Sequence, residues 1–274
     1  MKTRLILFIS ISFILPVSNG CKNNTSDSKN TDKTIPIIEY VCTNSYPHDK
    51  TSYTEGFLIH NGRLFESTGS FKDLPQTKSL FGIVDLKTGN IDVKAEIDKV
   101  KYCGEGITFL NGKVFQLTYT TKVGFVYDAI TFKKIKEFTI PSDEGWGLTT
   151  DGTSLIMSDG TNVLTYLDPD TLQVIKTISV TASGHRANKV KLNELEYIKG
   201  FVYANIWPTN TIVKIDLTDG KVIGELVLDS LAHDVRKIRS RSFDMNGIAY
   251  DSIADRIFIT GKLWRKIYEI KLRN

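Results

Sequence analysis

The sequence predicts an all-β fold, a five-bladed β-propeller with four-stranded antiparallel blades. Three observations predict it: one pattern recurs five times, tight-turn residues separate the strands, and the last copy lacks a strand that the N-terminal region can supply. In each copy a first strand leads, ten or twelve residues later, into the end of a second strand. The copies begin Glu55-Gly-Phe-Leu-Ile, Glu105-Gly-Ile-Thr-Phe, Trp146-Gly-Leu-Thr-Thr, Asn193-Glu-Leu-Glu-Tyr and Asn246-Gly-Ile-Ala-Tyr.

Turn chemistry defines the strands inside each copy. Between the first and second strands lie Asn61-Gly62, Asn111-Gly112, Asp151-Gly152, Lys199-Gly200 and the longer 251–255. Asparagine, aspartate and glycine tolerate the positive φ angles of tight hairpins. A third strand follows in FGIVDLKTG, GFVYDAITF, VLTYLDPDT, IVKIDLTDG and IYEIKL, and fourth strands are predicted at 90–97, 134–140, 173–180 and 221–228.

The repeat returns roughly every forty to fifty-five residues, which is the spacing of propeller blades. The last copy ends at its third strand, and the apolar, β-branched run 35–42 is the expected donor of the fourth. Pairing the two chain ends would close the ring and hide both edges. No segment has the pattern of a long amphipathic helix. A β-sandwich is the alternative, but it gives no reason for five copies in register.

The N-terminus predicts export and an anchor rather than part of the fold. Lys2 and Arg4 precede an apolar run, 5–17, of the length found in secretory signal peptides. Cys21 follows small and polar residues and resembles the lipid-acceptor site of a bacterial lipoprotein. We therefore expect a signal peptide at 1–20, a disordered tether at 21–34 and the propeller at 35–274, lipid-anchored in the bacterial cell envelope, periplasm-facing or at the outer membrane. A plain signal peptide cleaved near residue 20 is the alternative.

The composition limits the kinds of partner that we expect for this protein. The formal charge is +4, and removing Lys2 and Arg4 leaves 4 − 2 = +2, so no nucleic-acid partner is expected. A closed propeller has no edge that demands a partner, which favours a monomer. Four histidines without ligand spacing predict no metal site. Cys42 and Cys103 are compatible with a disulfide or with two buried free thiols.

Aligning the copies gathers ten positions, here called the mouth residues, at one end of the channel. Five lie at the start of the inner strands: Glu55, Glu105, Trp146, Asn193 and Asn246. Five lie at the end of the next strands: Gly69, Tyr119, Gly160, Trp207 and Lys262. These ends are adjacent in an antiparallel hairpin, so both sets share one mouth. A ring serving stability alone would be small and apolar, so we expect the functional site here.

Several stretches carry a family resemblance: YPHDKTSYTEGF, LFESTG, CGEGITFLNGKVFQLTY, EGWGLTTDG, LNELEY, VYANIW, MNGIAYD and ITGKLW. Together, over about residues 46–272, they resemble the plant- and bacterial-type glutaminyl-peptide cyclotransferases, a five-bladed propeller family. The resemblance implies an acyltransferase of the aminoacyltransferase class, which converts N-terminal glutamine of peptides or proteins, or free glutamine, to pyroglutamate with release of ammonia. It implies no required cofactor, and whether a structural ion occupies the channel stays open.

The resemblance also implies residue roles. Glu105 is implied as the principal catalytic carboxylate, Glu55 as a second acidic or amine-binding group, and Lys262 as the functional lysine. The substrate-binding set joins family positions with mouth positions: Trp146, Trp207, Asn193, Tyr119 and Asn246. Tyr119 stands where the family usually has tryptophan, which predicts altered specificity with the aromatic wall retained.

The mouth residues suit this chemistry. The α-amine of glutamine must be neutral to attack its own side-chain amide, so a carboxylate must take up a proton. A lysine or an asparagine amide can stabilise the oxyanion, and an acid must protonate the departing ammonia. Aromatic walls can fold the substrate into the ring-closing geometry.

Other interpretations compete with this one. An envelope propeller can act as a non-catalytic binding module, and a metal-dependent hydrolase of small esters or lactones would want more carboxylates on the axis. Glu55 could instead make a structural hydrogen bond, and we leave Glu66, Glu194 and Glu196 outside the catalytic set as inter-blade hydrogen-bonding groups. Basic loops around Arg186 and Arg239 are solvated loops that could also contact the rest of a peptide substrate.

Overall fold

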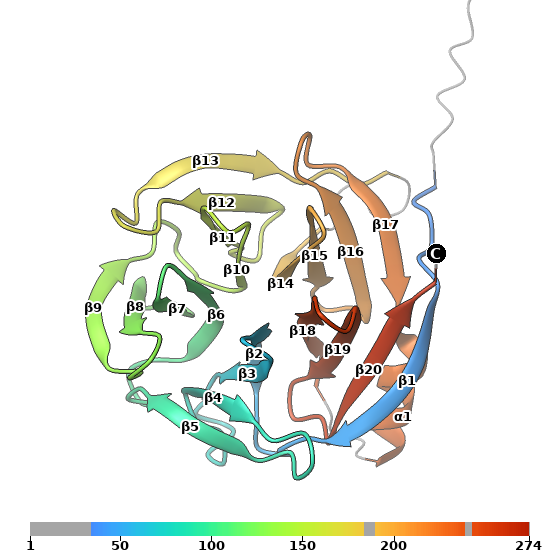
Figure 1. Cartoon of the computed structure of the whole chain (residues 1–274), viewed down its shortest axis with the longest axis horizontal. Helices are drawn as coiled ribbons and strands as arrows, with labels where there is room; N and C mark the ends of the chain where they lie inside the picture. The colour runs from blue at the N-terminus through green and yellow to red at the C-terminus, as the bar shows by residue number, and fades with distance from the viewer. Residues whose placement is uncertain (1–33, 184–189, 239–242, 274) are drawn as a thin grey trace, which may run out of the picture. The chain divides into compact units, whose positions relative to one another are not determined.

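The predicted five-bladed β-propeller is confirmed by the computed structural model, which describes residues 34–183, 190–238 and 243–273 (Figure 1). Five four-stranded antiparallel sheets surround a central axis, and their innermost strands are β2, β6, β10, β14 and β18 (Figure 1). The expected signal peptide, the lipidation site Cys21 and tether residues 21–33 lie outside the described residues, as do Arg186 and Arg239.

The blades follow one another along the chain. Blade 1 contains β2 (Thr54–His60), β3 (Arg63–Thr68), β4 (Leu80–Val84) and β5 (Ile91–Glu96). Blade 2 contains β6 (Gly104–Leu110), β7 (Lys113–Thr118), β8 (Val123–Asp128) and β9 (Lys134–Thr139). Blade 3 contains β10 (Leu148–Thr150), β11 (Leu155–Met157), β12 (Val163–Leu167) and β13 (Val174–Ser179). Blade 4 contains β14 (Leu192–Ile198), β15 (Phe201–Ile206), β16 (Thr211–Asp216) and β17 (Val222–Val227). Blade 5 contains β18 (Met245–Asp251), β19 (Arg256–Gly261) and β20 (Lys266–Leu272), with β1 (Tyr40–Pro47) as its outer strand.

The N-terminal strand closes the ring, as predicted, but its position was predicted too early in the sequence. β1 pairs antiparallel with β20 along its length, beginning at residue 40 and not at 35 (Figure 1). Just before it, the chain runs beside β17 of blade 4: the Ile38 N–H donates to the Glu225 carbonyl at 2.7 Å, and the Glu225 N–H donates to the Pro36 carbonyl at 2.9 Å. The segment therefore bonds to blade 4 before completing blade 5, and it ties the two blades together.

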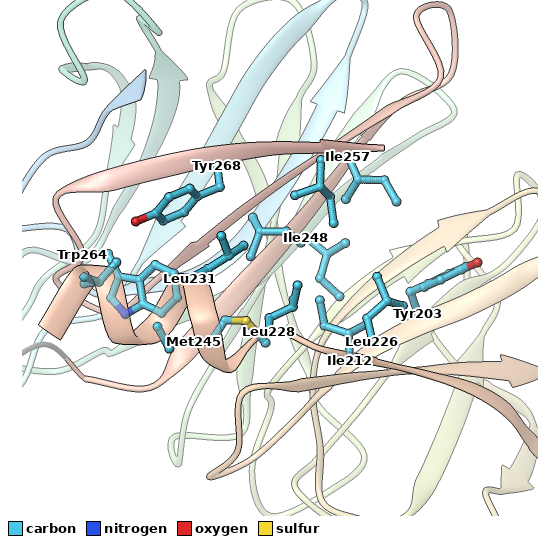
Figure 2. Close-up of a cluster of buried hydrophobic side chains, with 14 of the residues drawn as sticks. Tyr203, Ile212, Leu226, Leu228, Leu231, Met245, Ile248, Ile257, Trp264 and Tyr268 are labelled. Atoms are coloured by element: carbon cyan, nitrogen blue, oxygen red, sulfur yellow. The ribbon is translucent and has the colours of Figure 1, made fainter. Parts of the chain in front are cut away.

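One helix was not predicted from the sequence. α1 (Asp229–Ile238) follows β17 and begins the basic stretch that we interpreted as a loop. Leu231, Ala232 and Val235 lie on its buried face and pack into the apolar cluster between blades 4 and 5 (Figure 2). The sequence does carry the helical pattern, with apolar residues at 231, 232, 235 and 238, but the helix is only ten residues long.

The hydrophobic core is divided among the five interfaces between neighbouring blades. Each interface holds one cluster of buried side chains contributed by the two adjoining sheets, for example Phe81 of blade 1 with Phe125 of blade 2. The blades are therefore held to one another by apolar burial, while the axis is free to carry polar groups. None of the helices among the described residues is long and apolar enough to cross a membrane.

Candidate active site

Each inner strand has a β-bulge at its start, which directs the side chain of a mouth residue. In β2, β6, β14 and β18 the pairing register shifts at Glu55, Glu105, Asn193 and Asn246, respectively. In blade 3 the same two-against-one arrangement joins Trp146 and Gly147 to Ser158 through two backbone hydrogen bonds of 3.0 Å. A bulge leaves one residue out of the ladder and redirects its side chain, which is why such positions recur at active sites.

Neighbouring blades fix the backbone of these bulges. The Ser67 hydroxyl of blade 1 donates to the carbonyl of Glu105 in blade 2 at 2.6 Å. The Ser158 hydroxyl of blade 3 donates to the carbonyl of Asn193 in blade 4 at 2.7 Å. The mouth is therefore assembled across blade boundaries, and its geometry depends on the closed ring.

A cavity of about 370 Å³ opens at this mouth. Its lining side chains are Tyr53, Glu55, Phe71, Glu105, Tyr119, Glu144, Trp146, Asp159, Gly160, Thr161, Lys191, Asn193, Trp207 and Lys262. Eight of the ten mouth residues are among them, so residues far apart in the chain meet as the repeat alignment predicts. The other two are Gly69 and Asn246.

Glu55 and Lys262 form a buried ion pair at the base of the cavity. The Lys262 ammonium lies 2.9 Å from Glu55 Oε2, and both side chains are at least nine-tenths buried. The ammonium also lies 4.9 Å from the centre of the Tyr53 ring. Burial disfavours the charged lysine, but the Glu55 carboxylate beside it outweighs that cost and raises the Lys262 pKa. The lysine is thus held as a fixed cation.

Asn246 is not among the lining residues of the cavity, and its predicted contact with substrate stays a prediction. It is fully buried behind Glu55, where its side-chain N–H group donates at 3.0 Å both to Glu55 Oε2 and to the Thr54 carbonyl. Both mouth residues of blade 5, Asn246 and Lys262, therefore hold the same carboxylate oxygen. The structure makes Asn246 a group that orients Glu55.

Glu105 lies beside this pair with only 4% of its surface exposed. Burial raises its pKa well above the usual range for glutamate, and the neighbouring Glu55 carboxylate raises it further, whereas Lys262 lowers it. Burial also raises the pKa of Glu55, while the neighbouring Lys262 ammonium lowers it. Glu105 therefore keeps its proton to higher pH than an ordinary glutamate, beside a Glu55 carboxylate that Lys262 stabilises.

Two tryptophans form an aromatic corner above the carboxyl pair. The Trp146 and Trp207 rings are perpendicular, with centroids 5.9 Å apart. The Trp146 indole N–H donates to Glu144 Oε2 at 2.8 Å, and the Trp207 indole N–H donates to Asp244 Oδ2 at 2.9 Å. Both tryptophans are cavity walls rather than core side chains.

The remaining predicted residues also reach the cavity. Asn193 is 3% exposed, and among the described residues its Oδ1 has no hydrogen-bond partner, which leaves a buried polar atom for a ligand to satisfy. Tyr119 lines the wall, and burial raises its pKa, so the phenol is a neutral hydroxyl there.

Sequence reasoning missed several lining residues because they lie on loops outside the repeat. Tyr53 and Phe71 flank the first hairpin, and their rings pack with centroids 4.6 Å apart at an angle of 54°. The Lys191 ammonium lies 4.9 Å from the centre of the Trp207 ring. Glu144 had the clearest signal, since an acidic residue stands two positions before a mouth tryptophan.

The glutamates left outside the catalytic set do bridge structural elements. Glu194 and Glu196 accept backbone N–H groups of β18, from Ile248 and Tyr250 respectively, both at 2.8 Å. Glu66 binds the buried His48 side chain at 3.0 Å. Over the described ranges, no group of three or more histidine, cysteine, aspartate or glutamate residues is arranged to hold a metal ion. Both cysteines of the propeller are free thiols, and Cys42 is exposed rather than buried.

Comparisons with known proteins agree with the geometry. An enzyme on a five-bladed propeller is indicated first: the chain matches the glutamine cyclotransferase family model over residues 14–272. It is 39% identical to a glutaminyl-peptide cyclotransferase of Arabidopsis thaliana over 263 residues, covering 95% of this chain and 79% of the relative. It also superposes on the crystal structure of Myxococcus xanthus glutaminyl cyclase with a TM-score of 0.74 and 27% identity, covering 88% of this chain and 98% of that one. The chain belongs to the glutamine cyclotransferase family.

Proposed function

We propose that this protein converts the N-terminal glutamine of peptides or proteins, or free glutamine, to pyroglutamate with release of ammonia. In chemical terms the reaction is an intramolecular aminoacyl transfer, in which the side-chain acyl group moves from the amide nitrogen to the α-amine. The observation that carries the proposal is the arrangement of two buried carboxyl groups, Glu105 and Glu55, which line an aromatic cavity with the Lys262 ammonium 2.9 Å from Glu55.

The pair can manage both proton transfers. The neutral α-amine attacks the side-chain carbonyl carbon, which forms the C–N bond of the ring and places negative charge on the oxygen. Glu105 gives its proton to the amide nitrogen, the C–N bond to that nitrogen breaks, and ammonia leaves. The carboxylate pair then takes the surplus proton from the ring nitrogen, so its proton count is restored.

The other cavity groups have supporting roles. The Lys262 ammonium offers N–H donors to the oxyanion, and its charge is fixed by Glu55 before substrate arrives. Asn193 offers an unpaired buried oxygen for a substrate N–H group. Trp146 and Trp207 enclose the flexible side chain in a folded conformation, which lowers the entropy cost of closing a five-membered ring.

The proposed steps use only side chains of this protein, so we propose that turnover needs no metal or cofactor. We expect chelators to leave the activity unchanged. Activity that disappears with a chelator and returns with a metal would overturn this part of the proposal and leave the fold and the carboxyl pair in place.

The test is incubation with a peptide that begins with glutamine labelled with ¹⁵N in its side-chain amide. The proposal expects the peptide to lose one ammonia by mass and the label to appear in the released ammonia. The matched control is the same peptide with an acetylated α-amine, which cannot cyclise. Release of labelled ammonia from the blocked peptide would indicate an amidase, and no reaction with either peptide would favour a binding module.

We also propose that the protein is exported and anchored in the cell envelope through a lipidated Cys21, on the strength of the sequence before the propeller. Metabolic labelling with a fatty acid should mark the wild-type protein and not a Cys21→Ser variant. Unlabelled protein released freely from the membrane would support the plain signal peptide.

We further propose that the propeller works as a monomer, since the pairing of β1 with β20 closes the ring without a partner strand. Sedimentation at micromolar concentration should give one species of the monomer mass. A stable dimer would overturn this expectation.

A further inference from the structure

Two carboxylates outside the proposed catalytic set each accept the indole N–H of one cavity tryptophan. Glu144 binds Trp146 at 2.8 Å, and Asp244 binds Trp207 at 2.9 Å. We propose that Glu144 and Asp244 are positioning residues, which hold the two indoles as the perpendicular corner that shapes the glutamine pocket. The inference rests on the proposed function, but the anchoring it describes can be tested without turnover.

The corner needs anchoring because both tryptophans stand at the edge of an open cavity. An indole on such a wall can rotate about two side-chain bonds unless its N–H or its faces are held. The rings are held at 90° to each other with 5.9 Å between centroids. Gly160 also fits closely under Trp146, since a Cβ atom there would lie 2.6 Å from the indole. The position of the Trp146 ring is therefore set both by packing and by its hydrogen bond.

Asp244 is tied to the proposed catalytic lysine through the backbone. The Lys262 N–H donates to the Asp244 carbonyl at 3.0 Å, and the Phe243 N–H donates to the Lys262 carbonyl at 3.2 Å. Backbone hydrogen bonds thus link Asp244, which accepts the Trp207 indole N–H, to Lys262, whose ammonium lies beside Glu55. The orientation of Trp207 is therefore coupled to the position of the lysine.

Glu144 is tied in the same way to the opposite side of the cavity. The Ser142 hydroxyl donates to the Glu144 carbonyl at 2.7 Å, and the next N–H, of Gly145, donates to the Tyr119 carbonyl at 2.9 Å. Tyr119 is itself a cavity wall. Two aromatic walls, Tyr119 and Trp146, are therefore linked through hydrogen bonds that pass through Glu144 and its neighbours.

Each carboxylate supplies both a negative charge and a hydrogen-bond acceptor, and substitutions can remove the charge while keeping the acceptor. Glu144→Gln and Asp244→Asn keep an oxygen that can accept the indole N–H but remove the charge. Glu144→Met and Asp244→Leu have similar size and remove both. The matched control is Asp143, an exposed carboxylate next to Glu144 whose partner is Lys122 and not an indole.

The experiment measures kcat and KM for a glutamine peptide and the quenching of tryptophan fluorescence by acrylamide. The chain has three tryptophans, and Trp264 is buried in the cluster beside α1, so it supplies a constant background. We expect Glu144→Met and Asp244→Leu to raise KM about tenfold, because a hydrogen bond to a charged group is lost, and to raise quenching. The Gln and Asn variants should have a KM close to that of wild type and the same protection from acrylamide quenching. Asp143→Met should match wild type in both measurements.

Three results would overturn the inference. Wild-type KM and quenching in the Met and Leu variants would show that the anchors are dispensable. An equal rise in KM and in quenching in the Gln and Met variants would show that the carboxylate charge is needed and that the hydrogen bond to the indole is not. If all four variants lose thermal stability and their KM rises in proportion to that loss, the contacts are merely structural. A wild-type protein inactive on glutamine peptides would refute the proposed function, while the quenching comparison would still test the anchors.

Discussion

Glu105 and Glu194 are both buried glutamates at the bulge of an inner strand, but their carboxyl groups have different partners. Glu194 accepts a backbone N–H on each oxygen, from Phe57 at 3.2 Å and from Ile248 at 2.8 Å. Glu105 lines the cavity beside Glu55, and burial and the Glu55 charge raise its pKa. The difference teaches that burial alone does not identify a catalytic carboxylate in a propeller. Oxygens occupied by backbone amides indicate a structural role, and a carboxyl group that lines a cavity beside a second carboxyl group and an ammonium indicates chemistry.

The packing of the inner strands explains why only blade 4 has a glutamate at the second bulge position. In the other four blades that position is glycine. In blades 1 to 3 the next inner strand approaches too closely for a side chain, and in blade 5 Gly247 has a positive φ of 125°. A Cβ atom on Gly106 would lie 2.4 Å from the Leu148 nitrogen, for example. Glu194 instead reaches from blade 4 to blades 5 and 1. It bonds three inner strands together near the axis.

The largest effect should follow Glu105→Gln, which keeps the shape of the side chain and removes its proton chemistry. We expect kcat/KM for a glutamine peptide to fall about 10²- to 10⁴-fold. The melting temperature should stay at or above the wild-type value, because the buried carboxyl of Glu105 is not favoured by backbone donors. Steady-state kinetics measures the expected fall in kcat/KM, and a thermal melt measures the melting temperature. Full activity would remove Glu105 from its role and leave the fold untouched.

Glu194→Gln should give the opposite result. The amide has only one acceptor oxygen, so its NH₂ group would face a backbone N–H donor at the axis. We expect a loss of about 2 kcal/mol in the free energy of unfolding, with kcat nearly unchanged. Urea unfolding followed by circular dichroism measures the first, and the peptide assay measures the second. Unchanged stability would mean that Phe57 and Ile248 find other acceptors, and the contrast with Glu105 would fail.

Glu55→Gln should shift the pH dependence of the reaction. Burial raises the pKa of Glu105, the Glu55 carboxylate raises it further, and Lys262 lowers it. Without the Glu55 charge, burial still acts but Lys262 is unopposed, so Glu105 should lose its proton at lower pH. If Glu105 supplies the proton for the leaving ammonia, the alkaline limb of kcat/KM moves to lower pH in the variant. An unmoved alkaline limb would contradict this assignment of the acid.

Much of this contrast could be read from the sequence, and part of it could not. The fivefold repeat placed Glu105, Trp207 and Lys262 at one mouth, because equivalent positions of repeated blades lie on one ring. The hydrogen bonds that separate Glu105 from Glu194 depend on the bulges and on the tilt of the inner strands, which spacing does not encode. The position of Asn246 behind Glu55 was missed for the same reason, since it depends on a bulge.

The smallest effect concerns Glu196, at the other mouth of the channel, where one oxygen accepts the Tyr250 N–H. Burial raises its pKa from 4.5 to about 8, so the folded protein holds a proton that the unfolded chain releases. The contribution of this group to stability is therefore complete below about pH 4.5 and is lost as pH rises towards 8. Urea unfolding at pH 5 and pH 8 should show a smaller difference between the two pH values in Glu196→Gln than in wild type. The exposed Glu137→Gln is the control and should keep the wild-type difference. Equal pH dependence in all three proteins would show that Glu196 is ionised in the fold, with its backbone donors stabilising the charge as they would at any structural carboxylate.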